Sequence, residues 1–207
     1  MLDYENRYKK NVLIAGLDEV GRGCLAGPVV CAAVIMPLEK ELIIDGINDS
    51  KKLTAKERER LDKLILEKAI AYSISIIDKE TIDEINILEA TKLGMKNAVE
   101  NLKIKPNILL IDAVKIESDI KQENIIKGDE KSYNIACASI IAKVYRDNYM
   151  KQISLKYPLY NFAQNKGYGT REHIECLLKN GPCQIHRKTF ISKILERGQY
   201  LKIPKTA

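Results

Sequence analysis

The chain has 207 residues, of which 45% are hydrophobic and 30% are charged. It is therefore long enough to bury one large core, and its composition excludes a disordered or collagen-like protein. No apolar run is long enough to cross a bilayer, and the polar start of the chain lacks the apolar region of a signal peptide. We therefore expect a cytoplasmic protein without a membrane partner.

The net charge of +6 is distributed unevenly along the chain. Residues 131–207 carry 14 Lys and Arg against four Asp and Glu, whereas the first 130 residues are acidic overall. A basic region of this kind suits a polyanion such as nucleic acid, and a solvated basic face without a partner is the alternative.

The five cysteines are odd in number and form no C-x-x-C pair. This pattern favours free thiols in a reducing compartment over a disulfide framework or a zinc site. The two histidines, His173 and His186, are predicted to be ordinary surface or capping residues.

The first predicted elements are two short strands. Residues 12–17 are apolar, too short for a helix, and lead directly into Asp18 and Glu19, which we expect at or just beyond the strand end. Neighbouring strand residues point to opposite faces, so in an extended strand only one of the two acids aims at a given site and the other reaches it obliquely. A bulge or turn at Val20-Gly21 would bring both to one rim. Residues 29–36 form a second apolar run, which we expect to pair antiparallel with the first.

Capping boxes at residues 54–57 and 81–84 predict the starts of two helices. The second helix is expected to end near Leu102, before the Lys105-Pro106 step. Between the two helices, residues 72–77 alternate in hydrophobicity and are β-branched, which predicts a third strand.

The second half of the chain repeats the opening pattern. An apolar run ends at Asp112, and a short mixed run ends at Lys127-Gly128-Asp129, so each predicted strand end carries an acid. Residues 134–153 then predict a helix rich in small residues. One polar face of this helix holds Ser139, Lys143, Arg146 and Asp147.

The step Tyr157-Pro158 breaks this helix and marks a soft boundary. We predict an α/β body over residues 1–156 and a small, basic, helical C-terminal appendage over residues 157–207. The two parts are expected to form one continuous functional unit.

Four carboxylates stand at the predicted strand ends, namely Asp18, Glu19, Asp112 and Asp129. Adjacent strands lie about 4.8 Å apart, so such acids can come close together. Clustered carboxylates repel one another unless a cation lies among them, and an all-oxygen set favours Mg²⁺ or Mn²⁺. Two such ions make a phosphodiester-cleaving site. For each acid taken alone, a solvated strand end is the alternative.

The turn Gly21-Arg22-Gly23 follows the first two acids directly. It is either a tight turn with an exposed arginine or a place where bare backbone amides approach a sugar-phosphate closely. A glycine pair alone is a weak signal, and the second interpretation gains weight only because the turn follows Asp18 and Glu19 directly.

Six blocks of sequence stand in order along the chain: Asp18-Glu19-Val20-Gly21-Arg22-Gly23 with Leu25-Ala26-Gly27-Pro28, Asn48-Asp49-Ser50-Lys51-Lys52-Leu53, Ile111-Asp112-Ala113, Lys127-Gly128-Asp129, residues 138–144 with Arg146-Asp147, and Lys166-Gly167-Tyr168-Gly169-Thr170 with His186-Arg187. These blocks resemble the signatures of ribonuclease HII, the type 2 RNase H family. The resemblance covers about residues 12 to 195.

The resemblance implies an RNase H-like fold with a five-stranded mixed sheet, flanking helices and a C-terminal helical appendage. It implies that the four carboxylates hold two divalent metal ions, and that the backbone of Gly21, Arg22 and Gly23 reads the ribose 2′-hydroxyl. Tyr168 would stack on the following deoxyribose, whereas without the resemblance we would expect a turn tyrosine. The implied phosphate contacts are Asn48, Ser50, Lys51, Lys143, Arg146 and Lys166.

The implied reaction is hydrolysis of the RNA strand of RNA–DNA hybrids and cleavage 5′ of ribonucleotides embedded in duplex DNA. The products carry a 3′-hydroxyl and a 5′-phosphate, and the biological role is ribonucleotide removal from DNA. Nothing in the sequence suggests an assembly larger than a monomer.

Two residues depart from the family pattern. Cys24 stands where many members have proline, and Asn165 stands where many have histidine. The related ribonuclease HIII usually has Gly-Lys-Gly at the first turn and an extra N-terminal domain, so Gly21-Arg22-Gly23 and the short N-terminal segment favour HII.

Two other functions fit parts of the sequence. A basic binding module for RNA or hybrids would explain the charge of the C-terminal third, although four acids facing a polyanion would weaken binding. A different two-metal nuclease of the superfamily, such as a Holliday-junction resolvase, would cut all-DNA substrates and ignore the 2′-hydroxyl.

Overall fold

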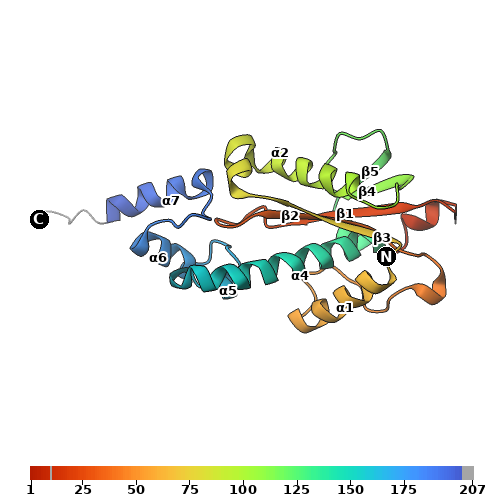
Figure 1. The fold of residues 1–207 in the computed structure, drawn as a ribbon, viewed down its shortest axis with the longest axis horizontal. Coiled ribbons are helices and arrows are strands. Elements are labelled where there is room, and N and C mark those ends of the chain that lie inside the picture. Colours follow the sequence, from red (N-terminus) through yellow and green to blue (C-terminus); the bar gives the residue numbers. More distant parts are fainter. Residues whose placement is uncertain (10, 202–207) are drawn as a thin grey trace, which may run out of the picture.

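The computed structural model describes residues 1–9 and 11–201, and it contains the predicted five-stranded mixed sheet (Figure 1). The strand order is β3-β2-β1-β4-β5. β2 pairs antiparallel with both β1 and β3, as expected for β1 and β2, whereas β4 runs parallel to β1 and to β5. The strands are β1 (Ile14–Val20), β2 (Val29–Ile35), β3 (Ala71–Ile77), β4 (Ile108–Asp112) and β5 (Lys121–Ile125).

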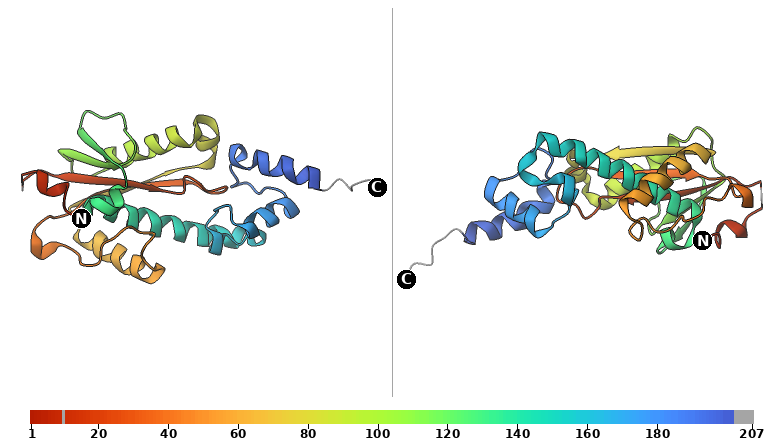
Figure 2. Two further views of the ribbon diagram at one scale, coloured as in Figure 1. Left: turned by 180° about the vertical axis from the view of Figure 1, so that it is seen from behind. Right: turned by 90° about the horizontal axis from the view of Figure 1, so that it is seen from below.

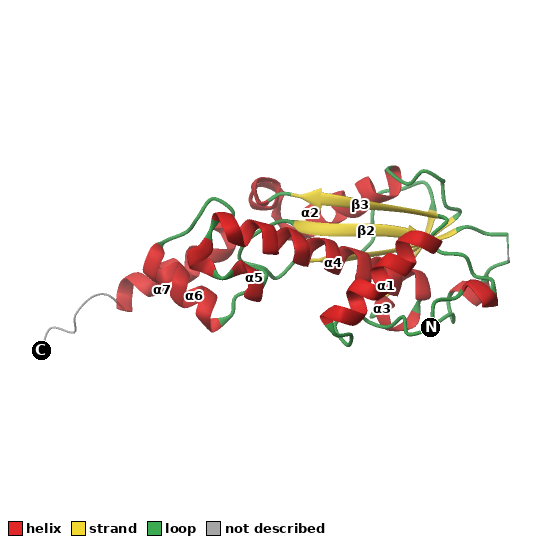
Figure 3. Cartoon of the chain, turned by 60° about the horizontal axis from the view of Figure 1, so that its bottom comes forward, coloured by secondary structure: helices red, strands yellow, loops and turns green. Residues whose placement is uncertain are grey.

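Helices cover both faces of the sheet. α2 lies on one face, and α4 with α1 lies on the other (Figures 1 and 2). The short and C-terminal helices α5, α6 and α7 extend from one end of the molecule (Figure 3). The α-helices are α1 (Ala55–Lys68), α2 (Lys79–Glu100), α3 (Gly128–Lys131), α4 (Tyr133–Lys156), α5 (Phe162–Asn165), α6 (Arg171–Asn180) and α7 (Lys188–Leu201), and the 3₁₀ helices are η1 (Glu5–Arg7), η2 (Lys40–Leu42) and η3 (Pro158–Tyr160).

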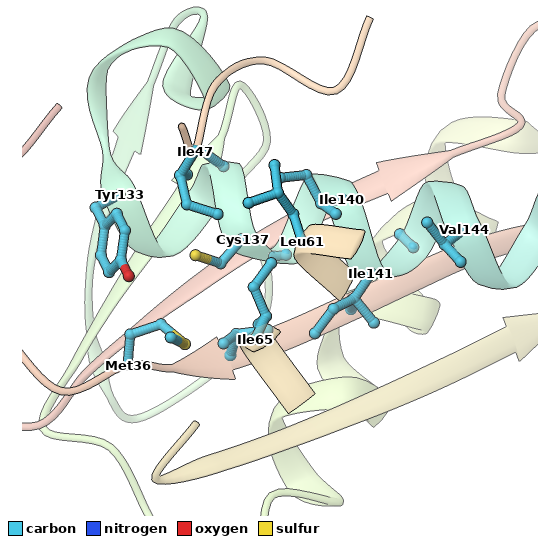
Figure 4. Close-up of a cluster of buried hydrophobic side chains, with 14 of the residues drawn as sticks. Met36, Ile47, Leu61, Ile65, Tyr133, Cys137, Ile140, Ile141 and Val144 are labelled. Atoms are coloured by element: carbon cyan, nitrogen blue, oxygen red, sulfur yellow. The ribbon is translucent and has the colours of Figure 1, made fainter. Parts of the chain in front are cut away.

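α4 packs unusually close to the central strand because both sides of the contact are small. A Cβ built on Gly16 of β1 would lie 2.1 Å from the backbone carbon of Asn134, so only glycine fits there. On the same face, α4 buries Cys137, Ile140 and Ile141 against Leu61 of α1 and the sheet (Figure 4). This packing fixes the helix whose next turns face the candidate site.

The capping box at Thr54 is confirmed, because its hydroxyl accepts from the Glu57 amide and the Glu57 carboxylate accepts from the Thr54 amide. The box predicted at Thr81 is wrong. α2 begins at Lys79, and the carboxylate of Asp78 caps it by accepting from the Thr81 amide at 2.8 Å. α2 also kinks at Asn86, whose φ is 67°.

The cysteines are free thiols within the described residues, as predicted. No described helix combines the length and the apolar character that crossing a membrane requires. α4 ends at Lys156, and the predicted division of the chain after this residue stays a prediction. The two parts are interleaved, because Leu25 donates to the Gly167 carbonyl at 2.8 Å and accepts from the Arg187 amide at 2.9 Å.

Candidate active site

Asp18 and Glu19 lie inside β1 rather than at or beyond its end, because the strand continues to Val20. Asp18 pairs with Ala32 of β2 and shares the face that α4 covers, where it is 5% exposed. Glu19 pairs with Cys31, which packs against α2 on the opposite face. The predicted divergence of the two side chains is thus present, since cross-strand partners share a face.

Asp112 ends β4, the parallel neighbour of β1. Leu17 pairs with Ile111, so Asp18 and Asp112 are the next residues along two adjacent strands and share one face. The Gly128 amide donates to Asp112 Oδ1 at 2.8 Å and ties the start of α3 to this strand.

Asp129 occupies α3 rather than a strand end, which corrects the sequence prediction. β5 stops at Ile125, and Lys127 turns the chain with a φ of 57° in the left-handed region. Asp129 is consequently buried at the start of a helical turn, on the element that its neighbour Gly128 anchors to Asp112.

The acids destabilise one another electrostatically. Burial raises the pKa of Asp18 well above its usual value, and the negative charges of Glu19 and Asp112 raise it further. Burial also raises the pKa of Glu19, against the lowering effect of Arg22. The pKa of Asp129 is raised by burial, with Lys51 opposing and Asp112 adding to the rise. A positive charge placed among Asp18, Glu19 and Asp129 would therefore stabilise the ionised forms of all three carboxylates.

The four carboxylates of the candidate site are chemically suited to a hard divalent cation. The donor set consists of carboxylate oxygens only, and Glu19 Oε2 is buried without any hydrogen-bond partner among the described residues. Across residues 1–9 and 11–201, however, no three His, Cys, Asp or Glu side chains converge closely enough to hold an ion as they stand. To hold an ion, these side chains would have to come closer together than they stand here.

The turn at Gly21 and Gly23 needs its two glycines for different reasons. Gly21 has a φ of +98°, and a Cβ there would lie 2.3 Å from Arg146 Nε, so the fold itself demands glycine. A Cβ on Gly23 would meet nothing within 4 Å and no strained φ applies. The fold therefore leaves room for a Cβ at Gly23. The Arg22 guanidinium reaches back to Glu19 Oε1 at 3.4 Å.

The loop Asn48-Asp49-Ser50-Lys51 reaches the same site. Lys51 Nζ lies 3.3 Å from Asp129 Oδ2, and Asn48 is exposed. Ser50 is buried, and its hydroxyl lies 2.9 Å from the Ser139 hydroxyl of α4. Asp49 is buried beside Asp129 and raises the pKa of that acid, a contribution that the sequence prediction missed.

Lys143, Lys166 and Tyr168 line a groove between α1 and the C-terminal half of α4. Lys143 Nζ is 5.6 Å from the Tyr168 ring centre and 2.8 Å from Asp147 Oδ1. Tyr168 is 37% exposed, so one part of its ring is open to a ligand. Asn165 is buried and holds the turn that leads into Tyr168, because its side-chain oxygen accepts from the Gly167 amide at 2.8 Å.

Arg146 does not lie where a phosphate contact requires it. It is 0% exposed, and its guanidinium donates to the carbonyls of Pro28, Ala26 and Lys166 at 2.8–3.1 Å. The sequence placed it on a polar helix face, but the segments that follow β1 and α5 cover that face. Arg146 is a structural arginine in this fold.

The two histidines are also buried, contrary to the prediction of surface residues. Their Nε2 atoms lie 3.0 Å apart. The Cys183 amide donates to His186 Nδ1 at 3.0 Å, and His173 Nδ1 lies 2.8 Å from the Tyr168 carbonyl. Two neutral imidazole rings account for this series of hydrogen bonds, with His173 donating to the Tyr168 carbonyl and His186 donating to His173. The appendage thereby fixes the backbone of Tyr168.

An RNase H-like sheet that carries Asp18 and Asp112 on two adjacent central strands, together with a groove lined by lysines, defines the class of RNase H-like nucleases. A family model for Ribonuclease HII matches residues 15–193. Ribonuclease HII from Caldicellulosiruptor bescii is 59% identical over 183 residues, which cover 88% of each chain. The chain belongs to the ribonuclease HII family.

Solved structures agree in fold. Ribonuclease H2 from Pyrococcus horikoshii OT3 matches with a TM-score of 0.74 at 28% identity, covering 90% of this chain and 98% of that chain. Bst-RNase HIII in complex with Mn²⁺ matches with a TM-score of 0.72 at 17% identity, covering 96% of this chain and 72% of that chain. Family membership makes this protein a type 2 ribonuclease H, a hydrolase that degrades the RNA of RNA–DNA hybrids.

The histidine pair predicts acid-sensitive stability. Burial and the neighbouring His173 lower the pKa of His186 from 6.5 to about 4, so the unfolded chain binds the proton first as the pH falls. The neutral His186 ring therefore makes its full contribution to the free energy of unfolding above about pH 6.5, and this contribution declines between about pH 6.5 and about pH 4. The loss amounts to about 3 kcal/mol at most.

Urea unfolding of the wild type and His186→Gln between pH 7.5 and 4 measures this effect. The stability advantage of the wild type should be largest near pH 7 and should shrink as the pH falls. An advantage that is constant across this range contradicts the assignment of a neutral buried ring.

Proposed function

We propose that this protein cuts the RNA strand of hybrids and also cuts 5′ of single ribonucleotides embedded in duplex DNA, leaving a 3′-hydroxyl and a 5′-phosphate. The observation that carries this proposal is that buried Asp18 and half-buried Asp112 stand at the same level on two adjacent strands, and that the exposed Gly23 turn follows the strand of Asp18. A ribonucleotide backbone can approach both features at once, and its 2′-hydroxyl distinguishes it from DNA.

The proposed metal ligands are Asp18, Glu19, Asp112 and Asp129, and the proposed cofactor is two Mn²⁺ or Mg²⁺ ions. The raised pKa of Asp18, the unpartnered Glu19 Oε2 and the oxygen-only donor set support this assignment. The related Bst-RNase HIII structure is a complex with Mn²⁺. Such ions supply activation of water for in-line attack and stabilisation of the leaving 3′-oxygen.

The residues around the acids then bind and orient the substrate. The amides of the Gly21-Arg22-Gly23 turn read the ribose 2′-hydroxyl, and Tyr168 stacks on the following deoxyribose. The proposed phosphate contacts are Asn48, Ser50, Lys51, Lys143 and Lys166. Arg146 is left out of this set because backbone carbonyls occupy its donors.

We further propose a cytoplasmic monomer that acts on hybrids and on duplex DNA containing ribonucleotides. Its role would be the removal of ribonucleotides from DNA. The reduced state of Cys24 and the other thiols is compatible with that compartment.

A labelled duplex with one embedded ribonucleotide tests the proposed function directly. Incubation with Mn²⁺ should give a single cut on the 5′ side of the ribonucleotide, whereas EDTA and an all-DNA duplex should give none. Binding without cleavage would instead support a hybrid-binding module. Cleavage of the all-DNA duplex would support a nuclease that ignores the 2′-hydroxyl.

Asp18→Asn and Asp112→Asn should each reduce cleavage by on the order of 100-fold or more, because each removes charge from the proposed metal site. In EDTA, Asp18→Asn should unfold at a higher temperature than the wild type, since it removes a buried charge that its neighbours repel. Turnover at the wild-type rate in both variants would refute the ligand assignment.

Gly23→Ala separates function from folding, because the fold has open space at this Cβ. We expect the free energy of unfolding of this variant to lie within about 1 kcal/mol of the wild-type value, since alanine also reduces the entropy of the unfolded chain. Cleavage at the embedded ribonucleotide should nevertheless fall at least tenfold, because the methyl group stands between the turn and the sugar. Full activity of Gly23→Ala would mean that the substrate does not approach this backbone.

A further inference from the structure

The turn that follows Glu19 is held from inside the molecule by one side chain, Arg187. Its guanidinium donates three hydrogen bonds to backbone carbonyls: Nη2 to Gly21 at 2.8 Å, Nη1 to Arg22 at 3.0 Å, and Nε to Gly27 at 2.9 Å. Arg187 is itself 0% exposed and belongs to the segment that precedes α7. The appendage thus reaches across the chain to fix a turn of the body.

The direction of these carbonyls determines the direction of the neighbouring amides. In a trans peptide the N–H of one residue points opposite to the carbonyl of the residue before it. Because Arg187 draws the Gly21 and Arg22 carbonyls inward, the amides of Arg22 and Gly23 point away from the guanidinium. Within the described part of the chain, neither amide donates to a protein acceptor. Both donors therefore remain for a ligand.

Burying the positive charge of Arg187 to stabilise this turn costs free energy. A buried charge is normally paired with an opposite charge, yet no carboxylate of the described residues lies within 4.0 Å of this guanidinium. Arg146 lies beneath the same loop and binds Pro28 and Ala26 carbonyls, so its like charge adds to the cost. Burial lowers the pKa of Arg187 to about 10, which reflects this cost. The guanidinium offers its donors in one fixed plane, which suits three carbonyls held in a fixed arrangement.

We propose that Arg187 is a positioning residue for substrate recognition: it sets the carbonyls of Gly21 and Arg22 so that the amides of Arg22 and Gly23 face the ribose 2′-hydroxyl. The proposal rests on the proposed function of this turn. Arg187 does not touch the substrate. It determines how well the turn distinguishes a ribonucleotide from a deoxyribonucleotide.

The test compares the wild type with Arg187→Lys and Arg187→Met, all shown to be folded at the assay temperature. For each protein, kcat and KM are measured in Mn²⁺ on a duplex with one embedded ribonucleotide. An all-DNA duplex of the same sequence serves as a competitive inhibitor, and its inhibition constant reports binding that ignores the 2′-hydroxyl. Leu177→Ala, which loosens the appendage core but removes no donor from the Gly21, Arg22 and Gly27 carbonyls, is the matched control.

We expect Arg187→Met to lose at least tenfold in kcat/KM while the inhibition constant of the all-DNA duplex changes by less than twofold. Arg187→Lys, which keeps the charge and some donors, should lie between Met and the wild type. Leu177→Ala should leave the ratio of the two quantities unchanged.

Three results would overturn the positioning role. The first is a folded Arg187→Met or Arg187→Lys with the wild-type ratio. The second is a parallel loss of cleavage and of all-DNA affinity. The third is failure of both Arg187 variants to fold, which would assign the residue to stability alone. A wild type that treats both duplexes alike would refute the proposed function itself, before any variant is considered.

Discussion

Repulsion between buried carboxylates is the constraint on which the rest of this structure depends. Asp18 sits on the central strand of the sheet, and Asp112 ends the strand beside it, so the two charges are brought together by strand pairing itself. α3 adds Asp129 through the bond between Gly128 and Asp112. The sheet and α4 must be rigid enough to hold these charges together against their repulsion.

The buried arginines do not pair with the carboxylates of the candidate site, so these carboxylates stay available to bind other cations. The two fully buried arginines, Arg146 and Arg187, bind backbone carbonyls instead of the site's carboxylates. The lysine that reaches these acids is exposed to solvent: the side chain of Lys51 is 78% exposed, whereas that of its partner Asp129 is 6% exposed. Because the Lys51 end of the pair is open to water, the lysine can be displaced by a more strongly bound cation.

Much of this arrangement is predictable from the sequence. The apolar runs around Asp18 and Asp112 define the central strands, because a short buried strand leaves a clear pattern. Asp129 was harder to place, since one left-handed residue, Lys127, ends β5 early and starts a helical turn. The start of α2 was missed because Asp78 and Thr81 are both good capping residues, and only the backbone shows which one caps the helix.

Long-range burial explains the other differences between prediction and structure. Arg146 belongs to a polar face in the helical pattern, but residues more than 100 positions away cover that face and offer it carbonyls. His173 and His186 are isolated in sequence, yet the fold of the appendage places their rings in contact. Arg187 belongs to a family-like block, His186-Arg187, but nothing in its local sequence shows that it is buried against a distant turn. These residues act on backbone groups, and a sequence does not show which carbonyls will be left without a donor.

In the proposed mechanism, divalent ions neutralise Asp18, Glu19, Asp112 and Asp129 and connect them to the sugar-phosphate backbone. Anomalous scattering tests this proposal in crystals of the wild type and of Asp18→Asn, each grown with Mn²⁺ and a duplex containing one ribonucleotide. We expect manganese peaks among the four carboxylates of the wild type, with the ribonucleotide phosphate beside them, and weaker or missing peaks in the variant. Wild-type carboxylates that remain apart, with no peak between them and the bound phosphate, would contradict this proposal.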